Sequence, residues 1–334
     1  MLESLPAGAV ADPSLTIRIG EALGEVEAVF DRQLESDFPA VNELCRHVER
    51  YRGKRLRPVL TLLSGLAAAD GDAERGLTSR HATLAAVIEM IHMATLVHDD
   101  VLDEADVRRR GATVNRLRGN ETAVMLGDYL ISNAFHLCSS LGDPTINLEL
   151  GATTNTVCEG ELLQLHHRDD LSLDERTYLE IVRRKTAALV GICGRLGARL
   201  SGASVEVQQA LERFGEAAGI AFQIQDDLLD LAGDPEVVGK TLGRDLEKGK
   251  MTLPAVLLFA AAGGREREVA LSAILARDAV SLRALLEQRG AVDAARARAA
   301  SFVEDAKRAL EAVPDSPARE LLRSLADAVV ARSF

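Results

Sequence analysis

The chain of 334 residues has no tryptophan, and aromatic side chains make up only 3% of it. This shortage argues against a terpene cyclase, which steers a carbocation through a pocket that is commonly lined by aromatic rings. Positive charge is also scarce: 39 Lys and Arg stand against 51 Asp and Glu, so the formal net charge is −12. A nucleic-acid groove needs a basic face, so this acidic average argues against a nucleic-acid partner.

Cysteines and long apolar runs are few as well. The four cysteines are Cys45, Cys138, Cys158 and Cys193. They match no zinc-site spacing, so we interpret them as reduced, buried or neutral thiols. The N-terminal residues lack the pattern of a signal peptide, and charged residues or proline interrupt the apolar stretches elsewhere. We therefore expect a cytoplasmic protein, which could still contact a membrane surface transiently to release a greasy product.

Apolar residues follow a helical period. They recur at spacings of three and four or their multiples, as in Ile88, Ile91 and Thr95, and no strand pattern competes. Glycine and proline stand at plausible helix junctions, and no low-complexity linker divides the chain. We expect an all-α fold of about ten helices in a single domain over residues 1–334. Residues 1–14 could form a flexible N-terminal segment.

Two matching acidic motifs are the strongest signal, and both read DDxxD. Their members are Asp99, Asp100 and Asp103, and then Asp226, Asp227 and Asp230. Positions four apart share a helix face, so the first and third aspartates of each motif point in one direction. Aliphatic residues surround both motifs, so the carboxylates need cations or basic partners to stay ionised. Mg²⁺ prefers such oxygen ligands and often binds substrate phosphates as well, so the two motifs could clamp a diphosphate.

A single DDxxD sequence could equally be a solvated acidic turn. Two copies in similar apolar contexts make that interpretation much weaker. The pair Asp169 and Asp170 is a useful comparison, because it lies in a polar stretch and has no third aspartate at the right spacing. We interpret this pair as surface.

Basic residues occur at separate points along the chain, as a diphosphate site requires. They include Lys54, Arg55, Arg57, Arg108, Arg109, Arg110, Lys185, Lys240, Lys248 and Lys250. Arginine can bind two oxygens at once while lysine acts as a point charge, so this mixture suits a substrate with two phosphates. Four other arginines follow ordinary helix-surface spacing and are expected to be solvated. They are Arg183, Arg184, Arg195 and Arg199.

Two histidines lie close to the first acidic motif. His92 precedes Asp99 by two helical turns on nearly the same face, which would place an imidazole near the carboxylates. Alone, such a residue would more often be a core histidine with satisfied hydrogen bonds, and we expect that role for His98.

Taken in order, these motifs resemble those of the trans-type polyprenyl diphosphate synthases. The family's order and approximate spacing are kept by GKRLRP, IEMIHMATLVHDDVLDEADVRRR, LGDYL, EGELLQL, RKTAAL, AFQIQDDLLDLAGD and GKTLGRDLEKGKMTLP, which cover most of the chain. The resemblance implies an isoprenoid-synthase-type helical bundle around a central cavity, and a homodimer. It also implies a Mg²⁺-dependent prenyltransferase that condenses isopentenyl diphosphate with an allylic diphosphate to make a longer all-trans product.

The resemblance also implies roles for individual residues. All six motif aspartates would hold Mg²⁺ around the allylic diphosphate. Isopentenyl diphosphate would contact Lys54, Arg57, His92 and Arg109. The allylic substrate would contact Arg108, Lys185, Thr186, Gln223 and Lys240, with Lys250 as a further candidate. The catalytic residues, which stabilise charge on the departing diphosphate directly or through Mg²⁺, would be Asp99, Asp103, Lys185, Asp226 and Lys240.

One position departs from the family pattern. The family usually has Arg-Arg-Gly after its first acidic motif, whereas this chain has Arg108, Arg109, Arg110 and then Gly111. An ungapped count from Asp99 leaves Arg110 where glycine is usual, so the role of Arg110 stays open.

The helix face that runs from Asp99 towards the N-terminus bears on product length. Thr95, Ile91 and Ile88 lie on it. Short-chain members of the family often carry aromatic rings at the positions of Ala94 and Thr95, where the rings close the pocket. Both residues are small here, which favours a product longer than twenty carbons. Geranylgeranyl or farnesyl diphosphate synthase remains the alternative, with a plug from Phe135, Leu148 or Leu150.

Two other interpretations share the acidic helices. A class I terpene cyclase would use the same ionisation step but needs no second diphosphate site. A non-catalytic partner subunit could keep the fold, yet it has no physical reason to retain six costly inward carboxylates.

Overall fold

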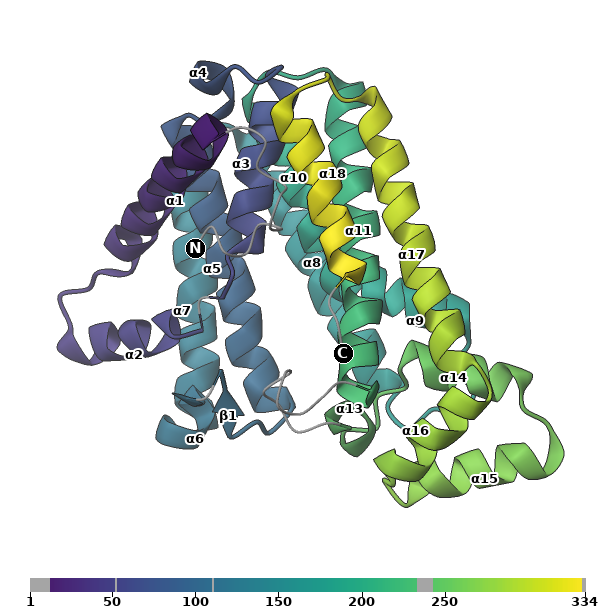
Figure 1. Cartoon of the computed structure of the whole chain (residues 1–334). Helices are drawn as coiled ribbons and strands as arrows, with labels where there is room; N and C mark the ends of the chain where they lie inside the picture. Colours follow the sequence, from purple (N-terminus) through teal and green to yellow (C-terminus); the bar gives the residue numbers. More distant parts are fainter. Residues whose placement is uncertain (1–12, 52, 110, 233–242, 332–334) are drawn as a thin grey trace. The chain divides into compact units, whose positions relative to one another are not determined.

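The computed structural model describes residues 13–51, 53–109, 111–232 and 243–331 (Figure 1). Most of the N-terminal segment expected over residues 1–14 lies outside these ranges, and the first helix begins at Pro13. The described residues form helices, connecting turns and one short hairpin, so the predicted all-α class is confirmed. Short helices such as α4 (Ala73–Gly76) separate the long ones, and these ranges therefore hold more helices than the roughly ten expected for the chain.

The chain forms two compact units, and each is described by itself. Unit 1 comprises Met1–Thr154, Ile192–Glu212 and Leu310–Ser324. Unit 2 comprises Asn155–Gly191, Arg213–Ala309 and Leu325–Phe334.

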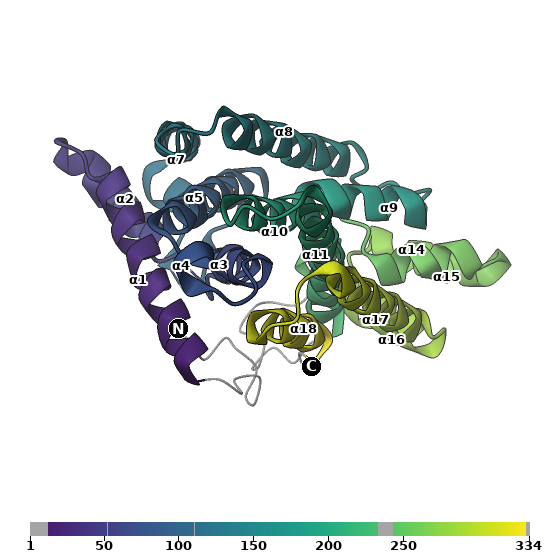
Figure 2. The same ribbon diagram turned by 90° about the horizontal axis from the view of Figure 1, so that it is seen from above.

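Unit 1 is built around one long helix, α5 (Ser79–Leu102), which packs against α1, α3 and α7. Figures 1 and 2 show α5 beside α7. The other elements of this part are α1 (Pro13–Leu34), α2 (Pro39–Glu49), α3 (Leu56–Ala68), α4, β1 (Val107–Arg108), β2 (Gly111–Ala112), α6 (Val114–Arg118) and α7 (Asn120–Ser139). Unit 1 also takes in the first part of α8 (Pro144–His166), most of α10 (Ala188–Leu200), the start of α11 (Val205–Ala232), the 3₁₀ helix η3 (Leu310–Ala312) and most of α18 (Pro317–Val330).

Helix α5 is apolar around most of its circumference, as expected of a helix that is buried on nearly all sides. Val87, Ile88 and Ile91 have no exposed surface. The helix begins with a capping box in which the N–H and hydroxyl of Thr78 lie 3.3 and 2.8 Å from Nδ1 of the buried His81. This cap fixes the start of the helix whose other end carries the first acidic motif.

A two-stranded antiparallel hairpin follows α5, with Val107 opposite Ala112 and Arg108 opposite Gly111. No strand was predicted here, because strands of two residues leave no alternation to detect. Arg109 adopts a left-handed backbone conformation, with φ 48°, after β1. The hairpin thus brings Arg108 and Arg109 back towards the end of α5.

Unit 2 has its own apolar core, which includes Ile224, Leu228 and Leu253. Helix α14 packs against α9, α16 and α17. The elements of this unit are α9 (Glu175–Val182), the π-helix η2 (Arg183–Ala187), α13 (Arg244–Glu247), α14 (Leu253–Ala261), α15 (Gly264–Leu275), α16 (Ala279–Gln288) and α17 (Ala291–Ala309), together with the remaining parts of α8, α10, α11 and α18.

Cys45, Cys138 and Cys193 are buried, and Cys158 is exposed. Burial raises the pKa of Cys45 and Cys138 to about 11 and that of Cys193 to about 12. Burial also raises the pKa of Cys158. All four thiols are therefore neutral at pH 7, as the sequence indicated.

Within the described ranges, no helix combines the length and the apolar character needed to cross a membrane.

Candidate active site

The first acidic motif lies at the C-terminal end of α5 in unit 1. Asp99 and Asp103 are half-buried, whereas Asp100 is only 1% exposed. Successive helix positions are rotated by about 100°, which explains why the middle aspartate turns inward while the outer two keep access to solvent.

Asp100 has one strong partner. Arg108 Nε donates a hydrogen bond to Asp100 Oδ1 at 2.8 Å. Asp100 Oδ2 is buried and has no hydrogen-bond partner among the described residues. Burial raises the pKa of Asp100, while Arg108 and the nearby Tyr51 hydroxyl oppose that rise. A buried carboxylate oxygen without a partner indicates that this motif is incomplete without a further cation or donor.

A basic group of side chains, namely Arg57, His92, Arg108 and Arg109, lies beside the first acidic motif, where Arg108 contacts Asp100. Burial lowers the pKa of His92 well below its usual value, and the charges of Arg57, Arg109 and Arg108 lower it further. His92 is therefore neutral at pH 7 and remains a hydrogen-bonding group beside three arginines. The structure thus brings together four of the residues that the sequence assigned to substrate binding.

Glu89 is part of this group, although the sequence did not single it out. Its side chain is 5% exposed, and its charge raises the pKa values of Arg55, Arg57 and Arg109, against the larger lowering effect of burial. The signal that could have found it is an acidic residue within an apolar helix, one turn before His92.

The segment before α3 leaves room for Arg109. A Cβ atom on Gly53 would lie 2.1 Å from Arg109 Nη2, so a glycine lets this guanidinium approach the backbone. Lys54 is the next residue and is exposed.

The second acidic motif lies on α11 in unit 2 and repeats the same exposure pattern. Asp226 and Asp230 are half-buried, and Asp227 is 6% exposed. The Tyr178 hydroxyl donates to Asp227 Oδ2 at 2.6 Å, and Gln223 Nε2 donates to Asp227 Oδ1 at 2.9 Å. Burial and the charge of Asp245 raise the pKa of Asp227 to about 8.

Gln223 links this motif to a second predicted residue. The Thr186 hydroxyl donates to Gln223 Oε1 at 3.0 Å. Thr186 and Lys185 lie in the π-helix η2. Such wide turns occur frequently at functional sites. Lys185 Nζ lies 2.8 Å from Gln164 Oε1 and also pairs with Glu161.

Asp230 contacts the start of the described segment that begins at Gly243. Its Oδ2 accepts the Asp245 N–H at 3.1 Å, and its carbonyl oxygen accepts the Gly243 N–H at 2.9 Å. Lys250 belongs to this segment, and its N–H donates to the Asp245 carbonyl oxygen at 2.8 Å. Lys240 and Arg110, which the sequence also singled out, lie outside the described residues.

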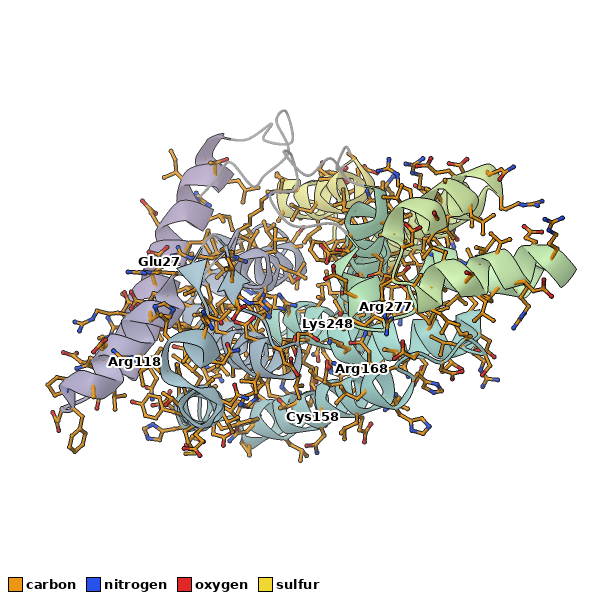
Figure 3. The ribbon with its side chains drawn as sticks, turned by 90° about the horizontal axis from the view of Figure 1, so that it is seen from below. Glu27, Arg118, Cys158, Arg168, Lys248 and Arg277 are labelled. Atoms are coloured by element: carbon orange, nitrogen blue, oxygen red, sulfur yellow. The ribbon has the colours of Figure 1, made fainter. Side chains whose placement is uncertain are left out.

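Asp169 is exposed, as the sequence indicated, but it has a structural partner. Arg277 donates to Asp169 Oδ1 at 2.8 Å and to the Leu246 carbonyl oxygen at 2.6 Å. Figure 3 labels Arg277 and Lys248 in this part of unit 2. Asp169 therefore helps to hold the α13 segment.

The other residues assigned to surface or core roles also have partners. His98 is half-buried, and its Nε2 lies 3.2 Å from the Val124 carbonyl oxygen. Arg183 and Arg184 pair with Glu180, Arg195 pairs with Glu149 and Glu212, and Arg199 pairs with Asp143. These arginines are half-buried or exposed and form ion pairs rather than a purely solvated face.

The residues predicted to control product length differ in exposure. Ala94, Ile91 and Ile88 have no exposed surface, while Thr95 is half-buried and its hydroxyl donates to the His92 carbonyl oxygen at 2.8 Å. Of the candidate plugs, Leu148 is 74% exposed.

The described residues contain no group of three or more His, Cys, Asp or Glu side chains that could hold a metal ion alone. Mg²⁺ is usually bound by one or two carboxylates, with substrate phosphates and waters completing the shell. Two half-buried aspartates on one helix face fit that requirement in each motif. The unpartnered oxygen of Asp100 fits it as well.

Known proteins resemble this chain over most of its length. The family model described as Polyprenyl synthetase matches residues 38–288. Octaprenyl diphosphate synthase from Escherichia coli (strain K12) is 37% identical over 318 residues, which cover 92% of this chain and 94% of that protein. Geranylgeranyl pyrophosphate synthase from Geoglobus acetivorans is 39% identical over 308 residues, which cover 89% and 92%. The solved structure of polyprenyl synthase from Caulobacter crescentus CB15, complexed with calcium and isoprenyl diphosphate, has a TM-score of 0.87 at 35% identity and covers 94% of this chain and 97% of that one.

Proposed function

Because the chain belongs to the polyprenyl synthetase family, we propose that it condenses isopentenyl diphosphate with an allylic diphosphate to make a longer all-trans polyprenyl diphosphate. The observation that carries this proposal is the shared form of the two acidic motifs. Each presents two half-buried carboxylates on one helix face and has predicted diphosphate-binding residues beside it. A chain with this pair of motifs is suited to bind and ionise a diphosphate ester.

We assign isopentenyl diphosphate to the basic group of unit 1. Arg57 and Arg109 would bind its phosphate oxygens, and neutral His92 would donate one hydrogen bond to them. Lys54 is exposed at the edge of this group and would add a point charge. Glu89 would keep the arginines oriented when no substrate is bound.

We assign the allylic diphosphate to Asp99, Asp103, Asp226 and Asp230, together with Lys185 and Thr186. Bound Mg²⁺ would supply Lewis-acid stabilisation of the charge that develops on the departing diphosphate. The Caulobacter crescentus polyprenyl synthase was solved in complex with calcium, which supports a role for a divalent cation here. Lys185 would hold a phosphate oxygen with its ammonium group, which Gln164 and Glu161 already orient. Arg108, Gln223, Lys250 and Lys240 would complete the contacts.

The reaction would break the allylic carbon–oxygen bond, so that the electron pair leaves with the diphosphate. The isopentenyl double bond then attacks the allylic cation, and loss of a proton forms the new double bond. Arg57, Arg109 and His92 would fix the position of the attacking substrate. No side-chain nucleophile takes part, and the departing diphosphate is the candidate base for the proton.

For the product, we propose a chain longer than twenty carbons. The small side chains of Ala94 and Thr95 support this length, as does the 37% identity to an octaprenyl diphosphate synthase. Geranylgeranyl diphosphate is the second candidate. The Geoglobus acetivorans relative favours it, and so does the complete burial of Ile88 and Ile91 within unit 1.

We further propose that both units act as one catalytic domain, because the family match over residues 38–288 includes parts of both.

We also propose a cytoplasmic homodimer that contacts a membrane surface only when it releases product. Light scattering of the purified chain tests the dimer, and co-sedimentation with phospholipid vesicles during turnover tests the contact.

Mass analysis of products tests the proposed reaction. The purified chain would be incubated with Mg²⁺, labelled isopentenyl diphosphate, and geranyl, farnesyl or geranylgeranyl diphosphate as alternative starters. We expect extended prenyl diphosphates with more than twenty carbons. A terpene cyclase would instead release hydrocarbon or alcohol from the allylic diphosphate alone. No extension from any starter would favour a subunit that needs a partner.

A further inference from the structure

Each DDxxD motif buries its middle aspartate beside a tyrosine. The chain has only three tyrosines. Two of them, Tyr51 and Tyr178, are 2% and 4% exposed and lie next to Asp100 and Asp227 respectively. The third, Tyr129, is half-buried on α7. A scarce residue type thus occurs at equivalent places in two motifs that lie more than a hundred positions apart in the sequence.

In unit 1, Tyr51 connects three parts of the first motif's surroundings. Its hydroxyl accepts the Val114 N–H at 3.1 Å, which holds the start of α6. The Arg108 guanidinium lies 5.9 Å from the centre of its ring, and Arg108 in turn donates to Asp100. The hydrogen bond from Val114 holds the ring against which Arg108 lies, so Tyr51 restrains Asp100 through Arg108.

In unit 2, Tyr178 restrains the second motif more directly. It lies on α9, and its hydroxyl donates to Asp227 Oδ2 at 2.6 Å. Gln223 occupies the other oxygen of the same carboxylate. Both oxygens of Asp227 are thus engaged by protein donors, which ties α11 to α9 at the position between the two outer aspartates.

We propose that Tyr51 and Tyr178 are positioning residues, which hold the middle aspartate of each motif so that the outer carboxylates keep the orientation needed to bind Mg²⁺. This inference rests on the proposed function. Mg²⁺ demands nearly ideal octahedral geometry, so a small rotation of either helix end would weaken metal binding before it unfolded the protein. Residues that orient metal ligands in this way commonly contribute 10- to 100-fold to metal affinity or activity.

The test uses the full chain with Tyr51→Phe or Tyr178→Phe, since each change keeps the ring and removes only the hydroxyl. Tyr129→Phe is the matched control. Activity is measured against Mg²⁺ concentration with both substrates in excess. We expect the half-saturating Mg²⁺ concentration to rise by about ten-fold in Tyr51→Phe and Tyr178→Phe, with much of the activity recovered at high Mg²⁺. Tyr129→Phe should behave as wild type.

A purely structural role predicts something else. Either variant would then melt at a lower temperature and keep the wild-type Mg²⁺ dependence, and that result would overturn the proposal. Tyr51→Phe combined with Asp100→Asn provides a second test. If Tyr51 acts through Asp100, the double variant should match Asp100→Asn alone.

One further measurement separates this inference from the proposed reaction. The melting temperature of each protein is recorded with Mg²⁺ and inorganic diphosphate and without them. An inactive wild-type chain would contradict the proposed reaction. The inference about the tyrosines would still stand if Mg²⁺ and diphosphate stabilised wild type and Tyr129→Phe more than the other two variants, and it would fail if all four proteins responded alike.

Discussion

The ammonium group of Lys185 lies 2.8 Å from the amide oxygen of Gln164, and it also pairs with Glu161 on the same helix. Gln164 and Glu161, both on α8, thus orient Lys185, which lies in the π-helix η2. In the proposed reaction this arrangement would hold the charge in place before any substrate arrives, so little reorganisation would be needed when diphosphate departs.

Replacement of Lys185 by methionine should therefore lower kcat by about 100-fold or more, because one oriented cation is lost from the transition state. Arg183→Gln is the control, since Arg183 lies in the same π-helix but pairs with Glu180 at the surface. Steady-state kinetics, with circular dichroism to verify folding, measure the effect. The assignment of Lys185 to the allylic diphosphate is wrong if Lys185→Met retains wild-type kcat.

Gly53→Ala should impair binding of isopentenyl diphosphate. The new methyl group would occupy the space of the Arg109 guanidinium, which must then move. We expect KM for isopentenyl diphosphate to rise by about ten-fold, the equivalent of one charge-assisted hydrogen bond. The KM for the allylic substrate should change little.

Gly20→Ala on α1 is the matched control for that experiment, because nothing lies within 4 Å of the added atom. It should leave both KM values unchanged and stabilise the protein by about 0.5–1 kcal/mol, since alanine loses less backbone entropy in a helix. Equal KM values in Gly53→Ala and wild type would remove Arg109 from the binding site.

The outer aspartates should be needed for the metal-dependent step. Removal of divalent cations with EDTA should abolish activity, and Mg²⁺ should restore it. Asp103→Asn and Asp230→Asn should each lower kcat by about 100-fold or more, because metal stabilisation of the departing diphosphate is worth several kcal/mol. Asp106→Asn changes an exposed carboxylate paired with Arg116 and should have no such effect.

Thr95→Phe should shorten the product. Thr95 is half-buried, so a ring can replace it with little strain and narrow the path beside α5. Ala94 is fully buried, and Ala94→Phe should instead destabilise unit 1 by about 1–3 kcal/mol through overpacking. Mass analysis of the products measures the first change, and chemical denaturation measures the second.

Leu148→Ala is the control for product length. Its side chain is 74% exposed, so its truncation should leave the distribution of products unchanged. A longer product from Leu148→Ala would show that Leu148 closes the path after all, and an unchanged product from Thr95→Phe would mean that the chain grows elsewhere.

His81 should make the protein sensitive to acid. Its Nε2 lies 3.1 Å from the Gly197 carbonyl oxygen and therefore carries the proton, which leaves Nδ1 to accept the Thr78 N–H. Burial lowers the pKa of His81 from 6.5 to about 4. Between these pH values the unfolded state binds more protons than the folded state, so stability falls as the pH falls from about 6.5 towards 4. His81 should account for about 3 kcal/mol of that loss.

Urea denaturation at pH 7 and pH 4.5 measures this loss. The difference in unfolding free energy between the two pH values should be smaller in His81→Gln than in wild type. His136 is exposed on α7, and His136→Gln is the control. It should leave the difference in unfolding free energy between the two pH values unchanged. An unaltered difference in His81→Gln would show that His81 is not the group that titrates.

The sequence predicted features that depend on helical periodicity. The paired exposure of Asp99 and Asp103 follows from their spacing of four, and so does that of Asp226 and Asp230. The same reasoning predicted His92 near the first acidic motif, whereas its place beside Arg57, Arg108 and Arg109 depends on the packing of separate elements. The burial of Asp100 and Asp227 also follows from the rotation of about 100° between successive helix positions. Their partners Arg108 and Tyr178 were not predicted, because these residues come from other elements, which no local pattern identifies.

Other features were missed for physical reasons that differ. The hairpin formed by β1 and β2 has strands of only two residues, so its alternation is too short to detect. Glu89 could be recognised as unusual only by its burial, which depends on the packing around α5. The ion pair between Asp169 and Arg277 joins residues more than a hundred positions apart, and neither residue lies in a motif.

The π-helix over Arg183–Ala187 also bears on how the length of this chain can vary. A π-helical turn contains one residue more than an α-helical turn, and it continues the hydrogen-bonded helix between α9 and α10 without a break. The apolar patterns before and after it are therefore out of phase by one position. Loss of a single residue here would restore an ordinary α-helix and would rotate the side chains before it relative to those after it by about 100°. A relative that is one residue shorter at this point would keep the fold, yet its alignment with this chain would need a gap beside the position of Lys185.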